Sequence, residues 1–198
     1  MLQISFNDHG VQRALNSLPK QTRFATAVAL TRTAKDAQGK VRQELPERFT
    51  IRNGWVAKGI RIRPASKSHL ESAVTILDKF MALQETGGTK RSHSGKGVAI
   101  PVGARPTPRS ITRPSKFPGA LLRKPRHFIA PFARNPAQKA VWRKVGRGGG
   151  KRKLMYMFAD EVEIQPRFGF QETVEDVAQS RFDDHFFPAL EMALRTSK

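Results

Sequence analysis

Two short clusters in this chain contain residue types that can perform catalysis or bind a metal. Gly148-Gly149-Gly150-Lys151 has part of the pattern of a phosphate-binding loop. That loop needs a glycine where Val145 stands and a Ser or Thr where Arg152 stands. The second cluster is Asp183-Asp184-His185, but neighbouring residues of a helix face different ways and cannot hold a metal by themselves. We interpret the two clusters as a flexible hairpin tip and a solvated acidic helix face.

The other candidate residues form no catalytic pattern. The remaining histidines, His9, His69, His93 and His127, are scattered along the chain. No serine stands in a nucleophile elbow, and no two carboxylates are placed for acid–base catalysis. We therefore predict that the protein is not an enzyme and has no catalytic, cofactor-binding or metal site.

A third feature is a stretch without acidic residues, residues 86–159, which we call the basic block. It contains eighteen Lys and Arg between Glu85 and Asp160. The whole chain has 36 basic and 16 acidic residues, a net charge of +20, so the chain outside the block is nearly neutral. Concentrated charge governs association with polyanions rather than the fold. The expected partner is nucleic acid, an acidic protein surface or an anionic membrane.

The kinds of partner expected for the basic block place different requirements on the sequence. A membrane-binding helix would be basic, amphipathic and anchored by aromatic residues, whereas both long helices predicted here carry mixed charge, so we set this alternative aside. Proteins that bind single-stranded nucleic acid place aromatic residues among their cations. The aromatic residues of the block are Phe117, Phe128, Phe132, Trp142, Tyr156 and Phe158, and most of them fall in segments predicted to be ordered rather than among the charges. Nonspecific contact with a polyanion, an arm that ties subunits together and a plain solvated loop all remain open.

The candidate contact residues are cations of the basic block. Cations that neutralise phosphates release counterions, so binding of DNA through them would depend steeply on salt. No helix-turn-helix, zinc-finger or RNA-recognition signature accompanies them. The residues expected to contact DNA or an acidic partner are Lys90, Arg91, Lys96, Arg105, Arg109, Arg113, Lys116, Arg123, Lys124, Arg126, Arg143, Lys144, Arg147, Lys151, Arg152 and Lys153.

Length and composition indicate one domain with an extended arm. The chain has 198 residues and no cysteine, which excludes disulfides and thiolate zinc sites. The first ten residues contain an acid and no apolar run, so we expect no signal peptide. No stretch approaches the length of a transmembrane helix. These observations favour a product of the cytoplasm, without a membrane partner.

Two long amphipathic helices frame the predicted fold. Apolar residues recur every three or four positions over residues 24–45, where Pro46 is expected to end or bend the helix, and again over residues 172–194, where Pro188 is expected to kink or split it. Short strands are predicted around residues 2–6, 60–62, 72–77 and 98–102, with a brief helix through Leu15 and Leu18. Residues 140–164 have the pattern of a hairpin with a basic tip. The fold class is α+β, with two long helices packed on a small antiparallel sheet.

The domain boundaries follow from the prolines of the basic block. Residues 1–89 are predicted to form the N-terminal helices and first strands of a single α+β domain. Residues 90–139 are predicted to be a basic, proline-rich extended arm, because proline at this density opposes both helix and central strand. Residues 140–198 would supply the hairpin and the C-terminal helix that complete the same domain.

Four short segments resemble one protein family. Residues 29–37, ALTRTAKDA, resemble the AxNRTA helix that opens minor tail protein Z of long-tailed bacteriophages and related tail-completion proteins. Residues 51–60, IRNGWVAKGI, are similar to the passage from that helix to the first strand. Residues 83–89, LQETGGT, are similar to a Gly-Thr turn of the phage neck and tail-completion fold. Residues 186–190, FFPAL, are similar to the final helix of the family.

The resemblance implies a structural virion protein. Such a protein would form a homo-oligomeric ring, expected to be sixfold, at the neck of the tail, and would complete the tail for head–tail joining. Its partners would be tail-terminator, tail-tube and head-joining proteins, with possible nonspecific contact with packaged DNA. It would be assembled in the host cytoplasm and located in the virion. The alternative function is that of a nonspecific DNA- or RNA-binding basic protein.

Overall fold

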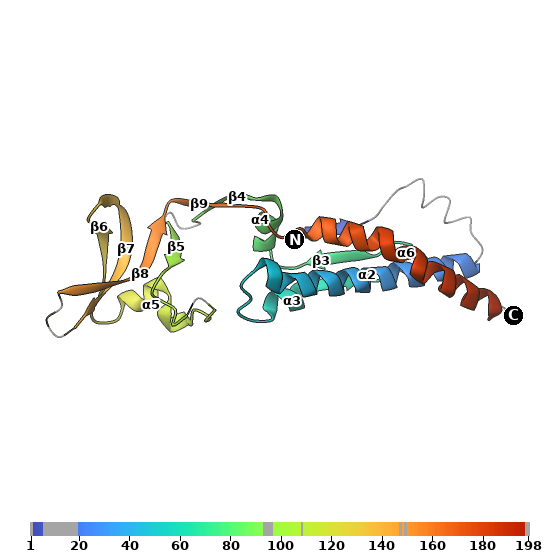
Figure 1. The fold of residues 1–198 in the computed structure, drawn as a ribbon, viewed down its shortest axis with the longest axis horizontal. Coiled ribbons are helices and arrows are strands. Elements are labelled where there is room, and N and C mark those ends of the chain that lie inside the picture. Colours follow the sequence, from blue (N-terminus) through green and yellow to red (C-terminus); the bar gives the residue numbers. More distant parts are fainter. Residues whose placement is uncertain are drawn as a thin grey trace. The chain divides into compact units, whose positions relative to one another are not determined.

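The computed structural model describes residues 2–5, 20–92, 97–107, 109–146, 148 and 150–196 (Figure 1). The chain divides into two compact units, which we call unit 1 (Met1–Gly87 with Gln165–Lys198) and unit 2 (Gly88–Ile164). The elements of unit 1 are β1 (Leu2–Ser5), α2 (Lys20–Arg48), α3 (Trp55–Gly59), β2 (Ile60–Arg63), β3 (Ala73–Ile76), α4 (Phe80–Thr86) and α6 (Phe170–Arg195). Those of unit 2 are β4 (Gly88–Arg91), β5 (Val98–Pro101), the 3-10 helix η1 (Pro114–Lys116), α5 (Pro118–Leu122), β6 (His127–Phe132), β7 (Asn135–Val145), β8 (Lys151–Ala159) and β9 (Glu161–Ile164).

The predicted α+β class with antiparallel strands is confirmed. The described strands form a three-stranded sheet in the order β1-β3-β2, a two-stranded sheet β4-β9 and a four-stranded sheet β5-β8-β7-β6. Every described strand pair is antiparallel. Strands β8 and β9 were expected to join the strands around residues 60–76, and this is wrong, because they lie in the sheets of unit 2.

Unit 1 is built on the contact between α2 and α6, which lie side by side (Figure 1). Alanines on the apolar stripe of α2 allow a close approach, and Ala34 and Ala37 are buried there. The β2–β3 pair supplies Ile60 and Ile76, neither of which is exposed. Burying apolar side chains of this size stabilises a fold by about 1.5–3 kcal/mol each. The complete cluster is Ala34, Ala37, Val41, Leu45, Ile60, Val74, Ile76, Met81, Phe168, Phe170 and Val174.

Both long helices continue through their prolines. Helix α2 ends at Arg48, beyond Pro46, and α6 runs to Arg195 with Pro188 inside it. Of the alternatives expected at each proline, the end at Pro46 and the split at Pro188 are therefore wrong, and the bend at Pro46 and the kink at Pro188 stay predictions. A proline removes one intrahelical hydrogen bond, and packing along the rest of each helix offsets that loss. The sequence prediction also missed the one-turn helix α3 before β2.

Unit 2 has its own core, so the expected extended arm over residues 90–139 is wrong. Leu121 of α5 packs with Val141 of β7 and Tyr156 of β8, all at most 3% exposed. The Tyr156 hydroxyl donates a hydrogen bond to the Lys116 carbonyl oxygen at 2.9 Å. Burial raises the pKa of the Tyr156 phenol above its usual 10.0, against a smaller lowering by the charge of Arg105.

Four prolines of this segment occupy places where proline is tolerated. Pro114 and Pro118 stand in the first turns of η1 and α5, where a missing N–H costs no hydrogen bond. Pro101 and Pro131 lie in β5 and β6, the edge strands of the four-stranded sheet. These four prolines therefore stand in edge strands and at helix starts rather than in an extended arm.

The hairpin predicted over residues 140–164 is formed by β7 and β8. It belongs to unit 2 and does not complete the domain of the first helices, whereas α6 does belong to unit 1. Strand β9 pairs with β4 instead of extending the hairpin. The predicted short N-terminal strand is confirmed as β1, while Phe6 and the brief helix through Leu15 and Leu18 lie outside the described residues.

Candidate polyanion-binding surface

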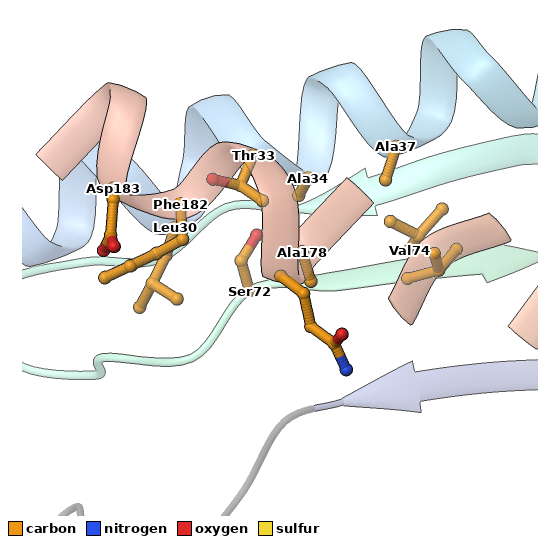
Figure 2. A pocket seen from close by; sticks show the side chains of 11 residues that line it. Leu30, Thr33, Ala34, Ala37, Ser72, Val74, Ala178, Phe182 and Asp183 are labelled. Atoms are coloured by element: carbon orange, nitrogen blue, oxygen red, sulfur yellow. The ribbon is translucent and has the colours of Figure 1, made fainter. Parts of the chain in front are cut away.

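The first site to consider is a pocket of about 380 Å³ in unit 1. Figure 2 shows Leu30 and Ala37 of α2, Val74 of β3 and Phe182 of α6 on its walls. Thr33 also lines it, and its buried hydroxyl oxygen lacks a hydrogen-bond partner among the described residues. The lining is mainly apolar, which suits an apolar group and supplies no acid–base pair. We therefore look for the functional surface elsewhere.

The Asp183-Asp184-His185 cluster does not converge on one point. The His185 Nε2 atom lies 2.6 Å from an Asp36 carboxylate oxygen and ties α6 to α2. Asp184 forms an ion pair with Arg181 at 3.2 Å, whereas Asp183 lines the pocket just described. Within the described ranges, no three His, Cys, Asp or Glu side chains come together as a metal site. The members of this cluster therefore link α6 to α2 and form polar contacts on α6.

Unit 2 carries most of the charge of the chain. It contains the eighteen Lys and Arg of the basic block and three acidic residues, Asp160, Glu161 and Glu163, a net charge of +15. Unit 1 has eighteen basic and thirteen acidic residues, a net charge of +5. The basic block therefore corresponds to one folded unit, and its charge lies on a defined surface.

Fourteen of the sixteen candidate cations fall into three groups. Lys90 and Arg91 belong to β4, where Arg91 pairs with Glu161 at 3.0 Å. The second group lies along the connection from β5 to β6: Arg105, Arg109, Arg113, Lys116, Arg123, Lys124 and Arg126. The third group comes from β7 and β8: Arg143, Lys144, Lys151, Arg152 and Lys153. Lys96 and Arg147 lie outside the described residues.

The third group is the densest, and the fold brings it together as a ribbon. Strand β6 joins β7 from His127 onward, opposite Arg143, and β5 joins β8 only over Tyr156–Ala159. The β7–β8 hairpin therefore projects beyond the sheet (Figure 1). At its last pair but one, Lys144 with Arg152, the Lys144 N–H still bonds to the Arg126 carbonyl oxygen just before β6, and the last pair, Val145 with Lys151, follows it without a third strand among the described residues. We call residues 143–153 the basic ribbon; of these, 147 and 149 lie outside the described residues.

Like charges oppose one another in the basic ribbon. Arg143 stands opposite Lys153, and Lys144 stands opposite Arg152. Directly opposed like charges destabilise a strand pair. Lys144, Arg152 and Lys153 are exposed, which lessens this repulsion through solvent screening. A polyanion bound along the ribbon would remove the remaining repulsion.

A basic hollow lies at the base of the ribbon. Arg126, His127, Phe128, Lys144 and Arg152 line it together with Gly150, and its volume is about 680 Å³. The Lys144 Nζ atom lies 5.9 Å from the centroid of the Phe128 ring, within cation–π range. The Lys144 backbone N–H donates to the Arg126 carbonyl oxygen at 2.8 Å.

The backbone of Arg126 is itself unusual. It has a φ of 66°, the one positive value among the described residues other than glycine. An L-residue in the left-handed region costs roughly 1–2 kcal/mol. Such conformations gather at binding sites, where surrounding contacts hold them. Here the bond from Lys144 holds the strained turn beside the hollow.

The tertiary structure changes the expectation that aromatic residues lie apart from the cations. Phe128 lies under Lys144, and Trp142 precedes Arg143 and Lys144 in β7. The Trp142 indole N–H donates to the Ala130 carbonyl oxygen at 3.0 Å, and its ring meets that of Phe132 edge to face. The signal available in the sequence was Trp142 directly before Arg143 and Lys144, but placing Phe128 beside Lys144 required the β6–β7 register.

Unit 1 carries a different surface, which sequence reasoning missed. Ile51, Trp55 and Phe80 are exposed and line one groove of about 290 Å³, together with Phe49 and Met81. Trp55 is 63% exposed. Exposed apolar residues that lie together often mark an interaction surface, whereas single scattered ones do not. We call these exposed residues the aromatic groove.

None of the described helices combines the length and apolar character that a membrane crossing requires. No protein-family profile, curated protein or solved structure matches the chain.

Proposed function

We propose that this chain is a structural protein of a long-tailed bacteriophage, which forms a homo-oligomeric ring at the head-proximal end of the tail and allows head–tail joining. In this proposal the two long helices and the β1-β3-β2 sheet of unit 1 form the body of each subunit. The tail-terminator, tail-tube and head-joining proteins are its axial neighbours. Unit 2 binds a polyanion, either DNA or an acidic face of a neighbour.

The observation that carries the proposal is the separation of two surfaces on two units. Unit 1 has the aromatic groove and a net charge of +5, and unit 2 has the basic ribbon and a net charge of +15. An aromatic groove suits association with protein, whereas concentrated positive charge suits a polyanion. A ring through which DNA passes needs both kinds of contact.

The resemblance to tail-completion proteins supports the same proposal. Residues 29–37 lie in α2, residues 51–60 span α3 and the start of β2, and residues 186–190 lie in α6. Residues 83–89 run from α4 into β4, where unit 1 ends. The family-like segments therefore gather in unit 1, the part proposed to build the ring.

The test of the proposal is deletion of the gene from the phage that encodes it. We expect full heads and separate tails, with joining restored when the protein is supplied. The purified protein should form rings in electron micrographs. Normal joining in the deleted phage would contradict the proposal.

Two variants test whether the aromatic groove forms the interface between subunits of the ring. Trp55→Ser with Phe80→Ser should shift the purified protein from rings to monomers, because the two changes remove most of the exposed aromatic area of the groove. Phe117→Ser is the control, since Phe117 is 50% exposed in unit 2. Light scattering after gel filtration measures the molar mass of both variants. An equal loss of rings in the two proteins would show that the groove is not part of the interface.

The second candidate is a nonspecific nucleic-acid-binding protein that acts as a monomer. The observation that favours it is the basic hollow, where Phe128 and Lys144 lie together. It predicts tight, salt-sensitive binding of random nucleic acid by a monomer. Formation of rings by the purified protein, and loss of head–tail joining when the gene is deleted, would support the first candidate over this one.

A further inference from the structure

We infer that the basic ribbon is an arm that lies in the major groove of duplex DNA and contacts the phosphates on both sides of that groove. The inference rests on the part of the proposed function that gives unit 2 a polyanion as its ligand. It names that ligand as double-stranded DNA and the binding element as residues 143–153.

The dimensions of the ribbon fit the groove. Two strands of a ribbon lie about 4.8 Å apart, and the major groove, roughly 12 Å wide, admits a two-stranded β-ribbon. Beyond the Arg143–Lys153 pair, the β7–β8 ladder continues through Lys144–Arg152, where only the Arg126 carbonyl oxygen still bonds to β7, and through Val145–Lys151, where neither β5 nor β6 joins it. This part is therefore narrow enough to enter where the four-stranded sheet is not.

The placement of charge distinguishes DNA from an acidic protein surface. Successive side chains of a strand point to opposite faces, so the Lys144–Arg152 pair lies on one face of the ribbon and the Arg143–Lys153 pair on the other. A protein surface would meet one face of the ribbon. A groove has phosphates along both walls, and only a ligand of that form neutralises both faces together.

The tip and the base of the ribbon agree with this placement. Three described residues near the tip, Gly146, Gly148 and Gly150, have no side chain, so the backbone at these positions can approach the groove closely. At the base, the basic hollow holds Arg126 and Phe128 beside Lys144, where a backbone phosphate would meet Arg126. Residues 143–153 contain no Asn or Gln, the side chains that read adenine in this groove, so any base preference of the ribbon would be for guanine, which Arg and Lys contact.

The test compares two triple variants of the full chain that lose equal charge. Lys144→Gln, Lys151→Gln and Arg152→Gln remove cations from the ribbon. Arg109→Gln, Arg113→Gln and Lys116→Gln remove as many from the connection between β5 and β6 and serve as the control. Binding of a short random-sequence DNA duplex is measured by fluorescence anisotropy over a range of salt concentrations, and circular dichroism checks that both variants fold.

We expect the ribbon variant to bind duplex at least about tenfold more weakly than the control. The plot of log K against log salt has a negative slope. For the ribbon variant its magnitude should be smaller than that of the unmodified protein by about 2.7, since each of the three lost phosphate contacts contributes about 0.9. Ethylation of single phosphates in the duplex should interfere with binding at two clusters, one on each strand, facing each other across the major groove. Polyglutamate should compete poorly.

Several results would overturn the inference. If the control variant lost as much affinity for duplex DNA as the ribbon variant, the ribbon would not be the binding element. Tighter binding of polyglutamate than of duplex would indicate an acidic protein ligand. Interference confined to one strand would exclude the groove. These outcomes are independent of the proposed function, because head–tail joining in the complemented phage is scored separately: joining without ribbon-dependent DNA binding refutes only this inference, and normal joining in the deleted phage refutes only the tail proposal.

Discussion

The Glu85 carboxylate caps a helix that begins far along the chain. Its two oxygens accept hydrogen bonds from the backbone N–H groups of Phe170 at 2.8 Å and Gln171 at 2.9 Å. The first N–H groups of a helix lack intrahelical partners, and negative charge there is favourable. Gly169 precedes the helix and has no side chain that could supply this cap, so a residue of α4 supplies it.

We therefore expect Glu85→Ala to reduce the free energy of unfolding of unit 1 by about 1–2 kcal/mol, the usual cost of losing a charged N-terminal cap. Urea denaturation followed by circular dichroism measures the change. Glu172→Ala is the matched control, because Glu172 lies exposed in the first turn of the same helix, and it should cost less than about 0.5 kcal/mol. Equal losses would contradict the assignment of Glu85 as the cap.

At the scale of elements, the turn after β5 depends on a close backbone approach. The Val102 N–H donates to the Met155 carbonyl oxygen at 3.0 Å, which draws the chain onto β8. A Cβ atom at Gly103 would collide with the Leu154 carbonyl oxygen, a backbone atom that cannot swing away. Glycine is required here by space rather than by its φ angle.

Gly103→Ala should therefore destabilise unit 2 by about 1–3 kcal/mol, as overpacking does elsewhere. The same substitution at Gly119 is the control, because nothing lies within 4 Å of a Cβ there and the residue is in α5. Gly119→Ala should change stability by less than about 1 kcal/mol, in the stabilising direction. Thermal melting of both proteins tests this, and a tolerated alanine at position 103 would mean that β8 does not hold the turn.

At the scale of the whole molecule, two cores stabilise two units. Ile76 is fully buried in the core of unit 1, and Leu121 is fully buried in that of unit 2. Replacing a buried Leu or Ile with Ala costs about 2–5 kcal/mol. Since Ile76 belongs to the core cluster of unit 1 and Leu121 to that of unit 2, each loss should remain local.

We expect Ile76→Ala to increase hydrogen exchange in α2, α6 and β3, and Leu121→Ala to increase it in β5–β8. Mass spectrometry of exchange in each unit measures the effect. Each variant serves as the control for the other. Loss of protection in both units from either substitution would mean that the chain unfolds as one cooperative body.

Much of unit 1 could be predicted from local patterns. The stripe through Ala34, Ala37, Val41 and Leu45 indicated α2, and alternation at Ile60–Ile62 and Val74–Ile76 indicated β2 and β3. Periodicity depends on the angle between successive residues, which is a local property. Prolines misled where packing compensated for them, as at Pro188 in α6.

The candidate site was predictable only in composition. The sequence identified the cations of the basic block but not which of them meet, because Arg126 and Lys144 come together through the β6–β7 register. Register depends on pairing across the turn and on the core beneath Val141. Nothing local to residue 126 indicated its positive φ.

The sequence alone determined where the charge lies and that the chain is α+β, because charge counts and hydrophobic periods are properties of short segments. Only the tertiary structure decided that the basic segment folds as a separate unit with its own core. It also decided that five of the described basic residues belong to one ribbon. Such features arise from contacts between distant segments, whose free energy depends on how buried side chains fit together.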